Sequence, residues 1–376
     1  MKKILLLIFI GLGVWALWYF LSPNKNSYTS SPYKNTSTPS TQENDTRSEI
    51  EVIAVNLDTP WAMVFLPDRS ILVTERAGRV RFIDENGILD TTPVAEIDSV
   101  KEIGEGGLLG MALHPDFSKN NFIYFYYTYS QDGNNTLNRV VRMTYGDKKL
   151  TDEKIIINNI PGASNHNGGR IKFGPDNYLY VTTGDAQDPS QAQNKTTLGG
   201  KILRITDMGA PAPGNPFGNL IFTYGHRNPQ GLAWDSNGIL WETEHGRSSP
   251  TGYDEINLLK AGGNYGWPLI QGNETRKDME IPIKNSGSDT VWAPAGSTFM
   301  GNSLFFGGLR GQTLYEAVII DTKVTEFNEY YIKEFGRIRD VVLSPDGLLY
   351  LTTSNRDGRA IPGKGDDKII RINKLK

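Results

Sequence analysis

The residue best suited to acid–base chemistry in this chain is His166, in the stretch NHNGGR. A neutral imidazole accepts a proton near neutral pH, so His166 is a candidate general base. The glycines that follow, Gly168 and Gly169, would let a ligand approach the backbone closely. Histidines also often satisfy backbone groups in tight turns, and on its own His166 fits that simpler interpretation better.

Three further histidines complete the set of four. His114, in ALHPDF, precedes a turn proline and is most simply a capping or packing residue. His226, in YGHRNPQG, and His245, in ETEHGRSS, lie in loop stretches that are dense with polar residues and glycine.

Arginines form the second set of interest. Arg337 and Arg339, in FGRIRDVVL, are two residues apart, so on a strand both would project to the same face. Two such guanidiniums in a mostly apolar strand need carboxylate partners or an anionic ligand. A salt-bridged solvent face is the simpler interpretation. With Arg227, beside Asn228, and Arg310 on other loops, the set also fits an anion-binding channel mouth.

Carboxylates could form a metal site. The stretch TGYDEINLLKAGGNYGWP contains Asp254 and Glu255 but lacks the dense acidic array of an EF-hand, so its spacing leaves calcium only as one possibility.

Motifs of several other enzyme classes are missing: the chain has no GxSxG, no HExxH and no GxGxxG between a strand and a helix. In GRAIPGKG, Gly365 stands where a phosphate loop requires Ser or Thr, so we interpret this stretch as an ordinary loop.

Composition narrows the class of protein. The chain has 376 residues, a hydrophobic content of 38%, a formal charge of -3 and no long basic run, which argues against nucleic-acid binding. It contains no cysteine, which excludes disulfides, thiolate metal sites and a cysteine nucleophile. Its 40 glycines and 17 tyrosines suit a turn-rich all-β protein better than a helical one.

A turn followed by an aliphatic–aromatic strand recurs along the chain. The clearest copies are FLPDRSILVTE, GPDNYLYVTTGD, DSNGILWETEHG and SPDGLLYLTTSN. Such recurrence at irregular spacings of roughly 50 residues predicts a six-bladed β-propeller of four-stranded antiparallel blades. We expect each copy to supply the inner strands of a blade, so that the loops after these strands meet on one face and form the site. A large β-sandwich with coincidental turn similarity is the alternative.

The N-terminal part differs from the rest. Residues 1–22 contain Lys2 and Lys3 followed by about 18 uncharged, mostly apolar residues, enough for a membrane-spanning helix. A cleaved signal peptide is the competing interpretation, but no typical cleavage site follows, so we favour an uncleaved membrane anchor. Residues 23–48 are rich in Ser, Thr, Asn and Pro and predict a flexible linker. The folded domain is then 49–376, outside the cytoplasm in either case.

Several motifs together resemble one family. EGGLLGMALHPDF, NHNGGRIKFGPDNYLYVTTGD, LGGKILRI, YGHRNPQGLAWD, DEINLLKAGGNYGWP and GRIRDVVLSPDGLLYLTTS follow in order from about Leu57 to Ile372. This pattern is similar to the soluble glucose dehydrogenase and aldose sugar dehydrogenase family, which uses pyrroloquinoline quinone (PQQ). The resemblance implies a six-bladed propeller with PQQ over the channel mouth, an aldose substrate oxidised at C1 to the lactone, and an electron acceptor that the sequence does not identify.

The resemblance also implies roles for individual residues. His166 would be the general base, taking the proton of the sugar C1 hydroxyl while hydride passes to the quinone. The residues that would bind the cofactor are Glu105, Arg227, Asn228, Arg310, Arg337 and Arg339. One calcium ion (Ca2+) would be held by the main-chain oxygens of Gly246 and Arg247 and act as a Lewis acid, and a second, structural calcium would lie near Glu255 and Tyr265.

Some positions depart from the family pattern. Glu105 stands where glucose dehydrogenases carry Gln, and Asn165 stands where they carry Asp, which makes the preferred sugar uncertain. His245 and Arg247 replace Gln and Pro in the calcium loop, a change that main-chain coordination tolerates. Two other functions stay open: a non-catalytic propeller that binds a glycan or protein partner, and a calcium-dependent hydrolase of the lactonase type.

Overall fold

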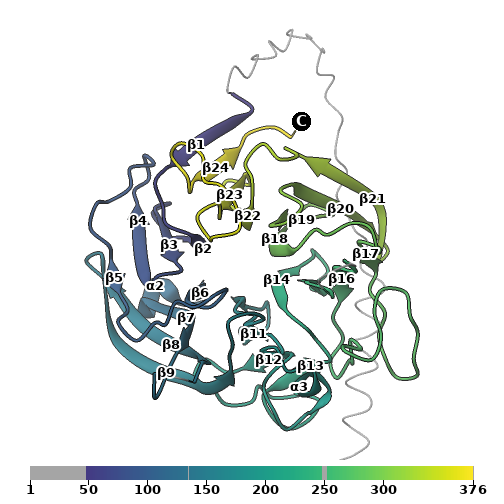
Figure 1. Ribbon diagram of the computed structural model, residues 1–376. Coiled ribbons are helices and arrows are strands. Elements are labelled where there is room, and N and C mark those ends of the chain that lie inside the picture. Colours follow the sequence, from purple (N-terminus) through teal and green to yellow (C-terminus); the bar gives the residue numbers. More distant parts are fainter. Residues whose placement is uncertain (1–47, 134, 248–251, 376) are drawn as a thin grey trace, which may run out of the picture. The chain divides into compact units, whose positions relative to one another are not determined.

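The computed structural model describes residues 48–133, 135–247 and 252–375. These residues form six four-stranded antiparallel sheets arranged as blades in a ring, as Figure 1 shows. The six-bladed all-β propeller expected from the recurring turn-and-strand phrase is therefore confirmed. The hydrophobic segment 1–22 and nearly all of the linker 23–48 lie outside the described residues. Within the described part, no helix is both long enough and apolar enough to cross a membrane.

The blades follow each other along the chain. Blades 1 and 2 consist of β2 (Pro60–Phe65), β3 (Ile71–Glu75), β4 (Arg79–Ile83), β5 (Ala95–Glu96), β6 (Leu108–Leu113), β7 (Phe122–Tyr129), β8 (Leu137–Gly146) and β9 (Lys149–Pro161). Blades 3 and 4 consist of β10 (Ile171–Phe173), β11 (Leu179–Thr183), β12 (Lys201–Ile205), β13 (Ile221–Tyr224), β14 (Pro229–Trp234), β15 (Leu240–Glu244), β16 (Glu255–Leu258) and β17 (Lys284–Asn285). Blades 5 and 6 consist of β18 (Pro294–Met300), β19 (Ser303–Gly308), β20 (Leu314–Ile320), β21 (Lys323–Tyr330), β22 (Ile338–Leu343), β23 (Leu349–Thr353), β24 (Ile369–Ile372) and β1 (Ile50–Ala54). Two short helices, α2 (Phe117–Asn120) and α3 (Ser190–Gln193), lie in connections.

The ring is closed by a strand from the other end of the domain. β1 pairs with β24 in antiparallel register, with Ile50 opposite Ile372 and Val52 opposite Ile370. Residues near the start of the domain therefore complete the last blade, and β1 lies at its outer edge beside β24 in Figure 1. Backbone hydrogen bonds thus join the two ends of the domain, so that no blade is left incomplete.

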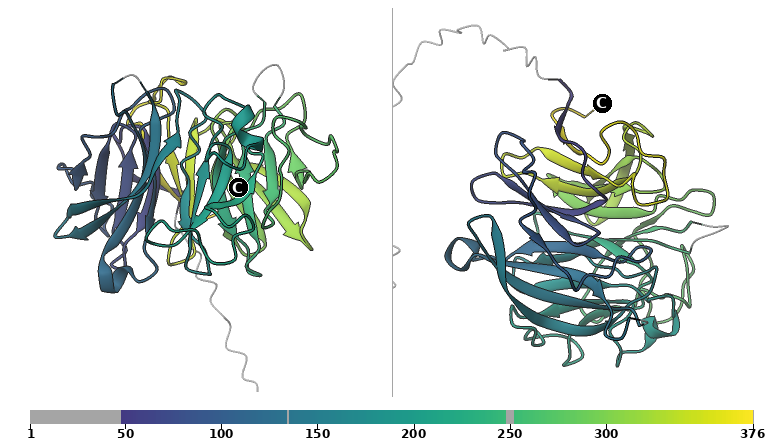
Figure 2. Two further views of the ribbon diagram at one scale, coloured as in Figure 1. Left: turned by 90° about the horizontal axis from the view of Figure 1, so that it is seen from below. Right: turned by 60° about the vertical axis from the view of Figure 1, so that its left-hand side comes forward.

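The blades stack face to face, so their central strands are buried on both sides. In β7 the run Tyr124 to Tyr127 has no measurable exposure, which explains why this strand reads FIYFYYTY rather than as an alternating pattern. Aromatic and β-branched residues suit such strands because they fill the space between neighbouring sheets. The core is accordingly a series of hydrophobic layers between blades. The left view of Figure 2 shows the ring of blades edge-on.

The recurring phrases occupy equivalent places. Each one spans the tight turn between the innermost and second strands of blades 1, 3, 4 and 6, with turns centred near residues 68, 176, 237 and 346. The segments that follow the second strands begin at Arg76, Gly184, His245 and Ser354. Because the strands alternate in direction, these segments lie at the same end of the ring as the starts of the innermost strands. This is the face on which the sequence analysis predicted the site.

Candidate active site

A cavity of about 190 Å3 opens at this end of the ring. Its walls come from residues that precede or begin the innermost strands and from the loops after β15, β19 and β23. Arginines outnumber carboxylates among its side chains, so the cavity attracts anions. The lining residues are Glu105, Gln230, His245, Gly246, Arg247, Asp254, Val291, Ala293, Leu309, Arg310, Arg337, Arg339 and Arg359.

Arg337 and Arg339 both line this cavity, and both are buried rather than on a solvent face. Arg337 has a carboxylate partner: its Nη2 lies 2.7 Å from Asp357 Oδ2, and its Nη1 donates to the Leu309 carbonyl at 3.0 Å. Arg339 has no such partner among the described residues. Its Nη1 donates to Gln230 Oε1 at 2.6 Å, while its buried Nε has no acceptor. Burial lowers the pKa of Arg339 to about 9, so an anion in the cavity would stabilise its charged form.

His166 lies beside the cavity and is held by two carboxylates. Its main-chain N–H donates to Glu105 Oε2 at 2.9 Å, and its ring Nδ1 lies 2.8 Å from Asp185 Oδ1. Asp185 is fully buried and also accepts the indole N–H of Trp267 at 2.9 Å. A carboxylate on Nδ1 fixes the ring orientation and leaves Nε2 as the nitrogen that can accept a proton. The geometry is that of an oriented general base.

The glycines after His166 have a different role from the one expected. A Cβ atom on Gly168 would lie 2.7 Å from the Thr182 carbonyl, and one on Gly169 would lie 2.7 Å from Leu109 Cδ1. Both residues also have positive φ angles. They are therefore required for the close packing of this loop against the protein's own strands, and the expectation that they make room for a ligand is wrong.

Arg227 and Asn228 lie between His166 and the loop after β15. Arg227 Nη1 donates to the His245 carbonyl at 3.3 Å, and Asn228 Oδ1 accepts the N–H of Gly168 at 3.0 Å. Glu244 accepts both main-chain N–H groups of the pair through Oε1, at 3.1 Å from Asn228 N. The buried Nδ2 of Asn228 has no acceptor among the described residues and is a free donor for a ligand.

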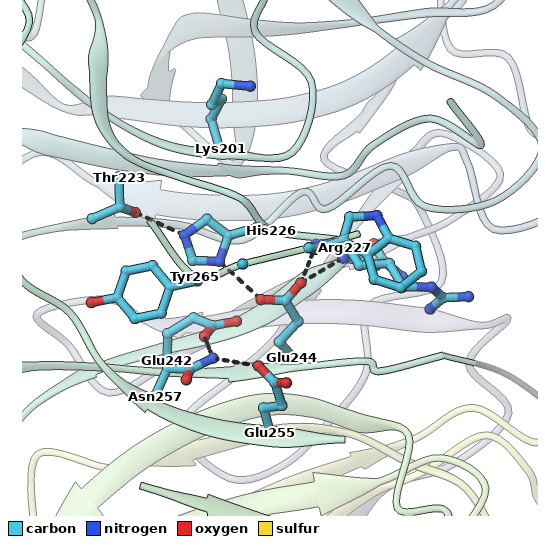
Figure 3. Close-up of polar contacts among 12 residues, drawn as sticks. Lys201, Thr223, His226, Arg227, Glu242, Glu244, Glu255, Asn257 and Tyr265 are labelled. Atoms are coloured by element: carbon cyan, nitrogen blue, oxygen red, sulfur yellow. Dashed lines mark hydrogen bonds and ion pairs between the residues drawn. The ribbon is translucent and has the colours of Figure 1, made fainter. Parts of the chain in front are cut away.

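Next to this pair lies a cluster of three carboxylates, shown in Figure 3: Glu242 and Glu244 are buried, and Glu255 is half-buried. Asn257 Nδ2 donates to both Glu242 and Glu255 at 3.0 Å, while Glu242 Oε1 has no partner in the described part of the chain. Burial and the neighbouring Glu244 raise the pKa of Glu242 well above its usual value and that of Glu255 to about 8. A hard cation would compensate this concentration of oxygen ligands.

The cluster borders a second cavity of about 20 Å3. Its lining includes all four residues expected to bind metal: Gly246, Arg247, Glu255 and Tyr265. The hydroxyl of Tyr265 donates to the Leu258 carbonyl at 2.7 Å, so only its main-chain oxygen remains for a metal. The ligand atoms of His226, Glu242 and Glu244 also lie within 4.8 Å of one another. Oxygen-rich, buried and partly unpartnered, these residues fit a calcium ion.

The remaining candidates are readily placed. Arg310 is exposed at the cavity rim. His226 is fully buried, with Nε2 on Thr223 at 2.8 Å and Nδ1 on Glu244 at 2.9 Å, so both of its ring nitrogens are occupied. His114 accepts the N–H of Asp116 on Nδ1 at 2.9 Å, in line with the capping role expected for it.

The sequence analysis missed four residues of this region: Asp185, Glu242, Glu244 and Trp267. A signal was present for the two glutamates, because WETEHG puts two carboxylates on one face of a strand that is otherwise flanked by apolar residues. Asp185 lies two residues after the end of the buried strand β11, and its position alone did not mark it as a functional residue. Trp267 carried no comparable signal.

Comparisons with known proteins agree with this geometry. The family model described as Glucose / Sorbosone dehydrogenase matches residues 57–362. The aldose sugar dehydrogenase YliI of Escherichia coli is 33% identical over 343 residues, which cover 83% of this chain and 91% of that protein. The PQQ-bound aldose sugar dehydrogenase of Streptomyces coelicolor superposes with a TM-score of 0.79 at 38% identity and covers 86% of this chain and 97% of that one. A putative oxidoreductase (glucose dehydrogenase) of Thermus thermophilus gives a TM-score of 0.80 at 42% identity, over 86% and 98% of the two chains. This chain therefore belongs to the glucose/sorbosone dehydrogenase family.

Proposed function

We propose that this protein oxidises aldose sugars at C1 to the lactone with pyrroloquinoline quinone as cofactor. The observation that carries the proposal is the arginine-lined cavity beside the oriented pair His166–Asp185. A quinone with three carboxylates needs several cations, and Arg337, Arg339 and the free donor of Asn228 supply such contacts. The relatives named for glucose or aldose sugar oxidation support the same activity.

In the proposed reaction His166 removes the proton of the C1 hydroxyl through Nε2. Asp185 holds the opposite ring nitrogen, so the ring faces one way and its positive charge is stabilised once the proton has arrived. When bound, the quinone supplies the acceptor for the hydride that leaves C1. The sugar thereby loses one proton and one hydride and becomes the lactone, with both electrons transferred to the cofactor.

Calcium belongs to the same proposal. The main-chain oxygens of Gly246 and Arg247 would hold one ion, which would supply Lewis-acid chemistry when bound. Glu255, the main-chain oxygen of Tyr265 and the unpartnered oxygen of Glu242 would hold a second, structural ion. Support comes from Glu242 and Glu255, which have no ion-pair partner among the described residues and whose pKa values are raised by burial.

We further propose that segment 1–22 anchors the protein to a membrane and that the catalytic domain lies outside the cytoplasm, where it passes electrons to an acceptor. The support is the apolar run after Lys2 and Lys3. Cell fractionation tests this: full-length protein in the membrane fraction with its N-terminus intact is the expected result, and release as a shortened soluble chain contradicts the anchor.

Dye reduction by the protein loaded with quinone and calcium tests the main proposal. Wild-type protein should reduce the dye with at least some of a panel of aldoses. His166→Gln should lower kcat by about 10²- to 10⁴-fold, the usual contribution of a general base. His114→Gln, a histidine far from the cavity lining, is the matched control and should stay active. Quinone that fails to bind favours a non-catalytic propeller, and quinone-free hydrolysis of lactones favours the hydrolase.

A further inference from the structure

The loop after β23, residues 354–368, places one arginine at the rim of the cavity. Arg359 lines the cavity with Arg337 and Arg339, but its side chain is 39% exposed whereas those two residues are buried. It is therefore well placed to meet a second molecule that arrives after the deeper arginines are covered by a cofactor.

Arg359 connects two of the four positions that the sequence analysis noted as departures from the family pattern, Glu105 and Asn165. Its Nη2 donates to Asn165 Oδ1 at 3.0 Å and lies 3.4 Å from Glu105 Oε1. Glu105 in turn accepts the main-chain N–H of His166 through its other oxygen, at 2.9 Å. One guanidinium thus touches both the residue before the proposed base and the carboxylate that fixes the backbone of that base.

Asp357, at the start of this loop, holds the backbone of Arg359 in place. Asp357 is buried and accepts the Arg359 N–H through Oδ1 at 3.0 Å, while its Oδ2 accepts from Arg337 Nε at 2.8 Å. Between them, Gly358 has a φ of 83° and turns the chain toward the cavity. Arg359 is therefore anchored through the same carboxylate as a cofactor-binding arginine, so its backbone is rigid although its guanidinium is partly exposed.

We propose that Arg359 contacts the sugar substrate and selects against cationic sugars. This inference rests on the proposed function. Arg359, Glu105 and Asn165 present donors and acceptors side by side at the rim, which suits the adjacent hydroxyls of a neutral aldose. A guanidinium at this point attracts a sugar carboxylate and repels a sugar ammonium. The substrate class is neutral and acidic aldoses, with amino sugars disfavoured.

Three sugars of one shape but different charge test the proposal: glucose, glucuronate and glucosamine. In Arg359→Met, kcat/KM for glucose should fall by about tenfold, mainly through KM, because one charged hydrogen bond to the substrate is lost. The fall should be larger for glucuronate. For glucosamine it should be absent or reversed, because Glu105 is then left without its cation. The quinone affinity, measured by absorbance titration, should stay within about twofold of the wild type.

Arg356→Met is the matched control. Arg356 lies in the same loop, but it donates from Nε to the Asp366 carbonyl and does not line the cavity. This variant should leave the ratios among the three sugars unchanged. An Arg359→Met variant that loses the same factor for all three sugars, or that loses quinone affinity, overturns the proposal and leaves Arg359 with a structural role only.

Sugar binding without turnover separates this proposal from the proposed function. Saturation-transfer NMR on full-length protein should show contact with glucose and glucuronate in the wild type and weaker contact in Arg359→Met. If the wild type binds these sugars in an Arg359-dependent way but reduces no dye, the proposed oxidation fails and the Arg359 contact stands. Sugar signals that do not depend on Arg359 refute the contact.

Discussion

The hydrogen bond between Asp185 and His166 gives the sharpest prediction about catalysis. Replacing Asp185 with Asn keeps the shape and volume of the side chain but removes the negative charge 2.8 Å from the ring nitrogen. The amide can donate to Nδ1, which favours the tautomer with the proton on Nε2, the atom that must accept the substrate proton. His166 is then still in place, but its Nε2 already carries a proton and cannot accept the one from the substrate.

The size of the effect follows from what this contact does. A positioned general base contributes roughly 10²- to 10⁴-fold, so loss of its correct tautomer should lower kcat by at least about 10²-fold, or ~2.7 kcal/mol of transition-state stabilisation. Asp185 also accepts the indole N–H of Trp267 at 2.9 Å, which an amide oxygen can still accept. Asp185 Oδ1, however, also accepts the Gln187 N–H at 2.9 Å, and an amide group that donates to His166 from this position cannot accept it. Stability should therefore fall by about 1–3 kcal/mol, the usual cost of leaving a buried donor without its acceptor.

The assay is dye reduction at saturating sugar, with quinone loading measured on the same sample by absorbance and the melting temperature measured by calorimetry. Asp188→Asn is the matched control, because Asp188 lies in the same loop but only caps its own turn through Ser190. A kcat within threefold of the wild type in fully loaded Asp185→Asn would refute the assignment of His166 and Asp185 as a working pair.

Two further predictions concern buried charges. Glu242→Gln should raise the free energy of unfolding of the calcium-free protein by about 1 kcal/mol, because it replaces a buried carboxylate that has one oxygen without a partner among the described residues. The same change should weaken the stabilisation by added calcium. Calorimetry with and without chelator measures both effects, and unchanged calcium stabilisation argues against Glu242 as a ligand. Burial lowers the pKa of Lys201 from 10.5 to about 7, so between these values the unfolded chain holds a proton that the folded chain has released, and stability should rise with pH. The slope is at most about 1.4 kcal/mol per pH unit and should disappear in Lys201→Met, which denaturant unfolding at pH 7 to 10 can check.

Local sequence signals were enough to predict the blades. A turn of the PDG or SNG type between two apolar runs specifies a hairpin by itself, and its repetition indicated a propeller. The closure by β1 could not be predicted in the same way. Its pairing with β24 joins Ile50 to Ile372, and nothing in either short segment encodes a partner more than 300 residues away. Only the geometry of a closed ring, which leaves one outer strand unfilled, selects it.

The site was predictable where residue types are unusual and not where they are ordinary. Arg337 and Arg339 stood out because two guanidiniums on an apolar strand need compensation, and both line the cavity. Asp185 lies in the loop that follows β11, where aspartate is common for backbone reasons, so nothing marked it as the partner of His166. The prediction for Gly168 and Gly169 failed for a related reason. Glycine in a sequence does not reveal whether the space beside its Cα is filled by a ligand or by the protein itself.

The arginine-rich cavity and the carboxylate cluster are linked through a shared residue, Glu244. The cavity and the cluster lie side by side, each with charge that its own neighbours do not balance. Glu244 belongs to both: its Oε2 pairs with His226 within the cluster, and its Oε1 accepts the main-chain N–H groups of Arg227 and Asn228. A cation that orders the carboxylates therefore also orders the backbone that presents Arg227 and Asn228 to an anion. Because such coupling is reciprocal, we predict that an anionic cofactor bound in the cavity would in turn raise the affinity of the cluster for a cation.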